Sequence, residues 1–91
     1  MTGRPVRVLI PSPLRSYTAD AAVVVAHGST LAAVLADLDR RYPGLRFRVI
    51  DEQGDIRRHI KFFVNGSPAA DLQPTLHADD EVMIVCALSG G

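Results

Sequence analysis

One amphipathic helix between residues 31 and 42 constrains the fold of this chain more than any other feature. Its apolar positions recur at steps of three and four, and they are Leu31, Val34, Leu35, Leu38 and Tyr42. This spacing places the apolar side chains on a single stripe of an α-helix. Asp37, Arg40 and Arg41 fall away from that stripe, and Asp37 and Arg41 are spaced for a surface ion pair. A helix with one apolar stripe can cover only one face of a sheet.

The residues on either side of this segment define where the helix begins and ends. Thr30 is the better candidate for the N-cap and Ser29 the alternative, because a side-chain oxygen can accept one of the first free helical N–H groups. Pro43-Gly44 follows the last apolar position and ends the helix.

Two strands are predicted before the helix. Residues 6–10 carry β-branched side chains at alternate positions, which indicates a strand with one buried face. Pro11-Ser12-Pro13 ends this strand, and residues 14–20 form a mixed, polar connection. A second strand is expected at residues 21–26, although the run Val23-Val24-Val25 is too uniform to show which side chains face inward. The connection is short, so the two strands should pair antiparallel.

Three more extended segments are predicted after the helix. Residues 60–64 form a strand that the turn dipeptide Asn65-Gly66 closes. A short extended piece is expected around residues 69–72, and the last strand spans residues 81–87. The order of elements predicts an α+β fold with a mixed sheet of four to five strands. One main helix packs on one face, and the other face is left to solvent or to a partner.

Residues 45–59 are the least readable part of the chain. Apolar residues alternate there loosely with four arginines, which are Arg46, Arg48, Arg57 and Arg58. The acidic turn at residues 51–55 lacks the ligand spacing of a calcium loop and is interpreted as a solvated turn. Two interpretations of the arginines stay open: a solvated face, or a docking patch for an acidic partner.

Composition excludes several classes of function. Ten basic residues balance ten acidic ones, which gives no reason to expect nucleic acid or a membrane as partner. The single cysteine, Cys86, excludes an internal disulfide and a multi-cysteine metal site, and its position in a strand favours a small core residue over a sulfur shuttle. His27, His59 and His77 show no ligand spacing and are expected at the surface. No stretch has membrane-spanning length, so a cytoplasmic protein is expected.

The chain ends in a short, narrow tail. Residues 1–87 are expected to form one domain, and Leu88, Ser89, Gly90 and Gly91 a flexible tail that follows an apolar strand. Glycine has no Cβ, so Gly90 and Gly91 could thread a narrow channel and deliver a carboxylate to a partner's active site. The alternative is a frayed end where small residues gather without function.

Several of these features together resemble the ubiquitin-like sulfur carriers of the ThiS/MoaD type, which are β-grasp domains. The residues that carry the resemblance are Thr30 at the helix start, Val64-Asn65-Gly66, Asp80-Glu81-Val82-Met83-Ile84 and the terminal Gly90-Gly91. Two departures stand out. Ala78-Asp79-Asp80 replaces the Asp-Gly-Asp common in the family, and Cys86-Ala87 stands where molybdopterin-synthase small subunits commonly carry prolines.

The resemblance implies a mechanism in which the chain is a co-substrate and not an enzyme, with no cofactor or metal of its own. An ATP-dependent adenylating enzyme of the ubiquitin-activating type would activate the Gly91 carboxylate, and Gly90 would allow threading. A sulfur-donor enzyme would then convert the adenylate to a thiocarboxylate. The sulfur would pass to a synthase for cysteine, molybdopterin, thiamine or a secondary metabolite. The chain could be the small subunit of such a synthase complex. The long segment 45–59 favours carriers for cysteine and related pathways.

Two other functions remain open at this point. The chain could be a ubiquitin-like protein modifier joined to targets through Gly91, or a binding module with an incidental tail.

The alternation of the strands predicts where a partner would dock. If the β-branched side chains of the first strand face the helix, an apolar set faces away from it, namely Leu9, Phe63, Met83 and Val85. Leu88 and Ser89 of the tail would extend this surface. The alternative is that residues 45–59 cover part of it.

Overall fold

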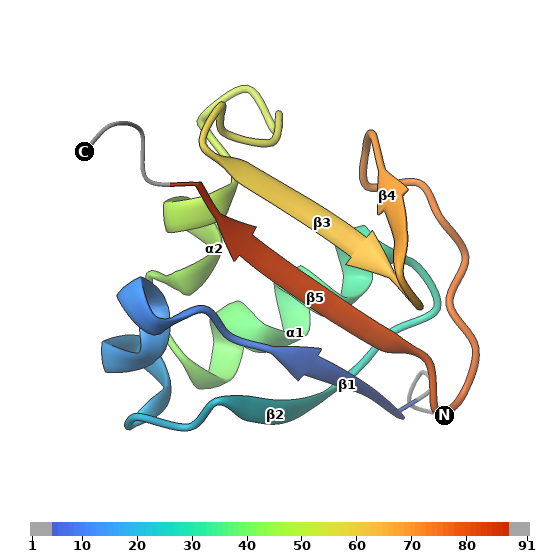
Figure 1. The fold of residues 1–91 in the computed structure, drawn as a ribbon, viewed down its shortest axis with the longest axis horizontal. Coiled ribbons are helices and arrows are strands. Elements are labelled where there is room, and N and C mark those ends of the chain that lie inside the picture. The colour runs from blue at the N-terminus through green and yellow to red at the C-terminus, as the bar shows by residue number, and fades with distance from the viewer. Residues whose placement is uncertain (1–4, 88–91) are drawn as a thin grey trace.

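Five strands form one mixed sheet, and the helices lie against one of its faces in this computed structural model, which describes residues 5–87 (Figure 1). The elements in chain order are β1 (Pro5–Leu9), the 3₁₀ helix η1 (Ser12–Thr18), β2 (Val23–His27), α1 (Leu31–Arg41), α2 (Leu45–Val49), β3 (Ile60–Val64), β4 (Ser67–Ala69) and β5 (Glu81–Cys86). None of the helices in the described part is long and apolar enough to cross a membrane.

The strand order across the sheet is β2-β1-β5-β3-β4. The first and last strands pair parallel at the centre, whereas β2 pairs antiparallel with β1, and β3 pairs antiparallel with both β5 and β4. In Figure 1 α1 and α2 lie behind this sheet, and no helix covers the face turned toward the viewer. The predicted mixed sheet with a helix on one face is therefore confirmed, as is the antiparallel pairing of the first two strands.

The core lies between the sheet and the helices, and it contains the side chains that the alternation predicted to face inward. Val6, Val8 and Ile10 are buried, as are Ile60 and Phe62 of β3 and Val82 and Ile84 of β5. From α1 the apolar stripe contributes Leu31, Val34, Leu35 and Leu38. Tyr42, predicted as part of the stripe, packs against the core but stays half-buried at the C-cap.

The segment 45–59 holds a helix that the sequence pattern did not predict. Helix α2 packs Leu45 and Val49 into the core, and Phe47 between them is exposed. Two features outside its own pattern start this helix. Gly44 takes a positive φ of 95°, and the Asp39 carboxylate of α1 accepts the backbone N–H groups of Gly44 and Arg46 at 3.1 and 3.3 Å. A helix of this length is not stable alone, so it forms only because of its cap and its packing against the core.

Several boundaries differ from the predicted ones. The connection at 14–20 contains η1, and β2 starts only at Val23 because Ala19 and Asp20 take positive φ angles of 53° and 69°. The piece expected at 69–72 is β4 at Ser67–Ala69. Asn65 and Gly66 both have positive φ, 50° and 86°, so they form a two-residue turn and pairing resumes at once.

The departure at Ala78-Asp79-Asp80 keeps a glycine-like backbone. Asp79 takes a positive φ of 71°, and its N–H donates to the Pro5 carbonyl at 2.9 Å. The Asp80 carboxylate accepts the His77 N–H at 2.7 Å and the Asn65 side-chain amide at 3.0 Å. These hydrogen bonds lower the pKa of Asp80. The Asn65 side-chain oxygen in turn accepts the N–H of Glu81 at 2.9 Å, which fixes the start of β5 to the turn after β3.

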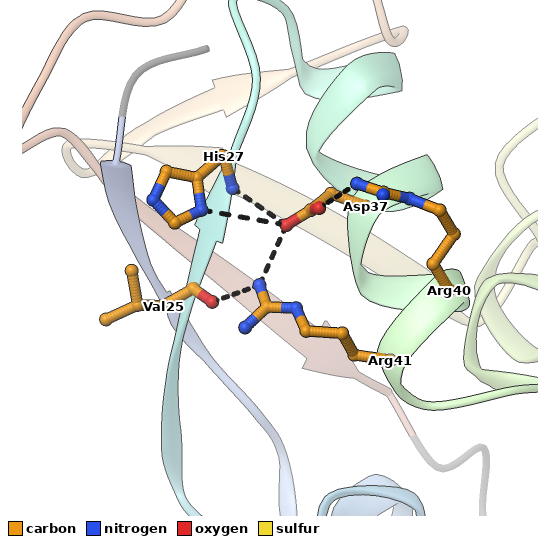
Figure 2. A network of polar contacts seen from close by, with 5 residues as sticks. All are labelled: Val25, His27, Asp37, Arg40 and Arg41. Atoms are coloured by element: carbon orange, nitrogen blue, oxygen red, sulfur yellow. Dashed lines mark hydrogen bonds and ion pairs between the residues drawn. The ribbon is translucent and has the colours of Figure 1, made fainter. Parts of the chain in front are cut away.

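Asp37 corrects the expectation of a surface ion pair, because its carboxylate is buried between α1 and the edge strand β2 (Figure 2). It accepts the backbone N–H of His27 at 2.9 Å and a guanidinium N–H of Arg41 at 2.7 Å, and it also pairs with Arg40. Arg41 donates at the same time to the Val25 carbonyl. Polar backbone groups on the outer side of an edge strand need partners, and α1 supplies them here.

The environment of Asp37 acts on its pKa in both directions. Burial raises the pKa, whereas the hydrogen bonds from His27 and Arg41 and the charges of Arg41 and Arg40 lower it, with a net decrease. A lowered pKa in the folded state means that the ionised carboxylate stabilises the fold. This contribution is present above the unfolded pKa of about 4 and is lost as the pH falls below it.

We expect Asp37→Asn to lower the free energy of unfolding by about 1–3 kcal/mol at pH 7, because an amide replaces the charged acceptor of three donors. The difference from the wild type should shrink as the pH falls below about 4. Urea unfolding at a series of pH values measures both effects. The control is Asp55→Asn, in an exposed loop, whose carboxylate makes no hydrogen bond or ion pair within residues 5–87. A pH-independent loss in Asp37→Asn would contradict the linkage.

Gly28 allows close contact between the end of β2 and the first turn of α1. A Cβ at this position would lie 2.7 Å from the Val34 nitrogen and 2.9 Å from two atoms of Ala33. We therefore expect Gly28→Ala to destabilise the fold by about 1–3 kcal/mol, as overpacking does elsewhere. Thermal unfolding measures this loss. Ser29→Ala, at an exposed neighbouring position, should stay within about 0.5 kcal/mol of the wild type, and equal effects of the two substitutions would refute the steric argument.

Candidate functional site

The tail leaves the sheet from the end of its central strand. β5 lies between β1 and β3, and Ala87 after it donates its N–H to the His59 carbonyl at 2.7 Å. Ala87 is the last residue that the structure describes. The predicted site residues Leu88, Ser89, Gly90 and Gly91 lie outside the described residues, so their role stays a prediction. The structure defines the place from which they start.

The four residues predicted for docking lie together on the sheet face that carries no helix. Met83 stands opposite Leu9 on one side and opposite Phe63 on the other, and Val85 follows two positions along β5. All four are half-buried. The segment 45–59 directs Leu45, Val49 and Ile50 into the core, which lies between the sheet and the helices. The register supports an apolar surface there, and its docking role stays a prediction.

The same surface continues over residues that sequence reasoning missed. Val23 pairs with Leu9, and Pro68 pairs with Phe63. One apolar row therefore crosses all five strands, and it consists of Val23, Leu9, Met83, Phe63 and Pro68. Val23 is 51% exposed and Val25 beside it 47%. We call this row, together with Val85, the outer apolar row.

Polar residues lie beside the outer apolar row. Arg7 and Glu81 pair across β1 and β5, with 3.7 Å between guanidinium and carboxylate, and Lys61 stands opposite Val85. An apolar patch with a charged border is the usual composition of a protein-binding surface. The arrangement has the composition expected of a docking surface.

Cys86 has the surroundings of a packing residue. It pairs with Ile60 on β3, is half-buried and packs against the core. The three histidines are exposed, as expected. Within residues 5–87 there is no group of three or more histidine, cysteine or acidic side chains that could hold a metal ion.

Comparison with known proteins identifies relatives along nearly the whole chain. The model of the ThiS family matches residues 8–91. The sulfur carrier protein CysO of Mycobacterium tuberculosis is 34% identical, over 94% of this chain and 98% of the relative. The crystal structure of CysO from the same organism superposes with a TM-score of 0.86 at 33% identity, covering 91% of this chain and 99% of that one.

Two further solved structures share the fold. The Amycolatopsis orientalis BexX/CysO complex includes a chain with a TM-score of 0.87 at 29% identity, covering 94% of this chain and 99% of its own. SAMP1, the small archaeal modifier protein 1 of Haloferax volcanii, has a TM-score of 0.81 at 26% identity, covering 96% and 99%. These neighbours confirm that the mixed sheet with its packed helices is a ubiquitin-like β-grasp fold.

Proposed function

The chain belongs to the ThiS family, and from this premise we propose that it is a sulfur carrier whose reactive group is the carboxylate of Gly91. The family match carries this proposal, because it extends through the Gly-Gly end instead of stopping at the folded part. The similarity to a sulfur carrier protein over 94% of the chain supports it. The chain acts as a substrate of its partner enzymes and supplies no catalytic side chain.

The proposed activation has two steps. The Gly91 carboxylate attacks the α-phosphate of ATP on an adenylating enzyme, pyrophosphate leaves, and an acyl-adenylate forms. A sulfur nucleophile then attacks the carbonyl carbon of the adenylate. AMP leaves and takes with it one oxygen of the former Gly91 carboxylate. Sulfide gives the thiocarboxylate directly, whereas a persulfide requires a thiol to reduce the remaining S–S bond. A synthase for cysteine or a related sulfur metabolite is the proposed acceptor.

The division of roles follows from the geometry of the chain. The end of β5 pairs with β3, and the Ala87 N–H donates to the His59 carbonyl, so the point from which the tail starts is anchored to the sheet. Gly90 and Gly91 present no side chain to a channel. The outer apolar row would bind the partner while the tail enters its active site. The crystallised complex of a related CysO with BexX supports a protein partner for this chain as well.

A protein modifier is the second candidate, and the likeness to SAMP1 favours it. Both functions begin with an activated Gly91, and they differ in the product. A carrier gains the mass difference between sulfur and oxygen, whereas a modifier becomes attached to a whole protein. Intact mass spectrometry of the chain purified from its native host distinguishes the two, and it also tests that Gly91 ends the mature protein.

We expect deletion of Gly91 to abolish activation and Gly90→Ala to slow it, because a methyl group enters a channel built for glycine. The measurement is the mass of the pure chain after incubation with ATP, a sulfide source and the adenylating enzyme. Ser29→Ala is the control, since it changes one exposed side chain outside the tail and outside the outer apolar row. Sulfur loading of the shortened chain would exclude Gly91 as the reactive residue.

We expect Met83→Lys to raise the chain concentration needed for half-maximal activation by about tenfold, the effect of a central interface residue. The charge would lie in the middle of the outer apolar row. Ala36→Lys places the same charge on the exposed side of α1 and should change this concentration little. Melting curves check that both variants fold. An unchanged value for Met83→Lys would place the docking surface elsewhere.

A further inference from the structure

A basic hollow lies beside the point where the tail leaves the sheet. Its volume is about 280 Å³, and it is lined by Phe47 and Arg48 of α2 and by Arg57 and His59 of the segment before β3. His59 also accepts the N–H of Ala87. We call this feature the tail-root hollow. The proposed function, which uses the tail, does not account for it.

The arginines of the tail-root hollow are held in place without being neutralised. Arg57 donates from Nε to the Phe47 carbonyl at 2.8 Å, and its guanidinium lies 4.6 Å from the centre of the Phe47 ring. Arg48 lies 5.9 Å from the centre of the Tyr17 ring. The ion pairs of residues 5–87 include neither Arg48 nor Arg57. Both guanidinium groups therefore keep hydrogen-bond donors for a carboxylate.

The positive charge extends past the hollow. A neighbouring depression shares Arg57 and adds Arg58 and Lys61, and none of the residues within 5–87 that line either cavity is acidic. The nearby acidic loop at residues 51–55 is not among the residues that line these two cavities. The Asp51 carboxylate accepts the N–H groups of Gln53 and Asp55, and Asp55 lines a different cavity together with Ala70 and Leu72. Charge complementarity therefore points to an acidic occupant.

The short length of the tail limits how far an enzyme that acts on Gly91 can lie from this hollow. This inference rests on the proposed function. Four residues follow Ala87, and an extended chain of that length spans at most about 13–14 Å. An enzyme that acts on Gly91 has to bring its active site within this distance of Ala87. Its surface around the channel entrance then meets the tail-root hollow.

We propose that the tail-root hollow binds an acidic segment at the channel entrance of the adenylating enzyme. Arg48 and Arg57 pair with its carboxylates, for which a planar guanidinium offers two parallel N–H groups. Phe47, 54% exposed, provides an apolar contact in the same hollow. The contact orients the carrier about the tail, whereas the outer apolar row supplies most of the buried area.

The test compares Arg48→Gln, Arg57→Gln and the double variant in ATP-dependent activation by the adenylating enzyme encoded in the same genome. Each single change should raise the half-saturating concentration up to about fivefold, and the double variant about tenfold, at low ionic strength. The rate at saturation should stay unchanged. Raising the salt to about 1 M should remove most of the difference, because screening weakens such pairs.

Arg40→Gln is the control for net charge, since it removes the same charge from an exposed position on α1, although Arg40 pairs with Asp37. Melting curves check folding, and Arg48→Gln leaves the hydrogen bond between Arg57 and Phe47 intact. Equal half-saturating concentrations for the double variant and the control would overturn the docking role while the proposed function stands. A wild-type chain that is never activated would remove both proposals together. Saturable binding of ATP to the isolated chain that the double variant abolishes would assign the hollow to a nucleotide and also overturn the docking role.

Discussion

The parallel pairing of β1 with β5 is the constraint from which the rest of this structure follows. The first and last strands of the described chain meet at the centre of the sheet, where β5 pairs with β1 over residues 81–83 and with β3 over residues 82–86. The start of β5 therefore has neighbours on both sides, and its end is held by the pairing with β3 and by the hydrogen bond from the Ala87 N–H to the His59 carbonyl. Ala87, the last described residue, is therefore anchored to the sheet, which carries the outer apolar row on one face and the helices on the other.

The helix α1 completes this arrangement at the edge of the sheet. Asp37 and Arg41 bond to the backbone of β2 at His27 and Val25, on the side where the sheet has no further strand (Figure 2). An unprotected edge strand invites pairing with other chains. This protection leaves the helix-free face of the sheet as the proposed place of association, and not the edge at β2.

Sequence patterns predicted the parts of the molecule in which apolar residues recur with a regular period. They missed the parts that depend on contacts between residues far apart in the sequence. Alternation along β1, β3 and β5 has a period of two, so it identified both the core and Leu9, Phe63 and Met83 on the outer face. The uniform run at Val23 has no such period, and its exposure follows from pairing with Leu9. Helix α2 requires a cap from Asp39, and the tail-root hollow requires α2 to meet Arg57. No local sequence pattern predicts helix α2 or the tail-root hollow.

Net charge is also a limited predictor, because equal numbers of basic and acidic residues can be unevenly distributed over the surface. The ten basic and ten acidic residues cancel, yet β5 begins after Asp79-Asp80 and ends beside Arg57 and His59. The six residues of this strand span about 20 Å, which exceeds the screening length of about 8 Å in physiological salt. The charges at the two ends of β5 therefore influence an approaching molecule independently of each other. The proposed partner would approach the basic end of β5, so a chain of balanced total charge can still have an electrostatic preference in docking.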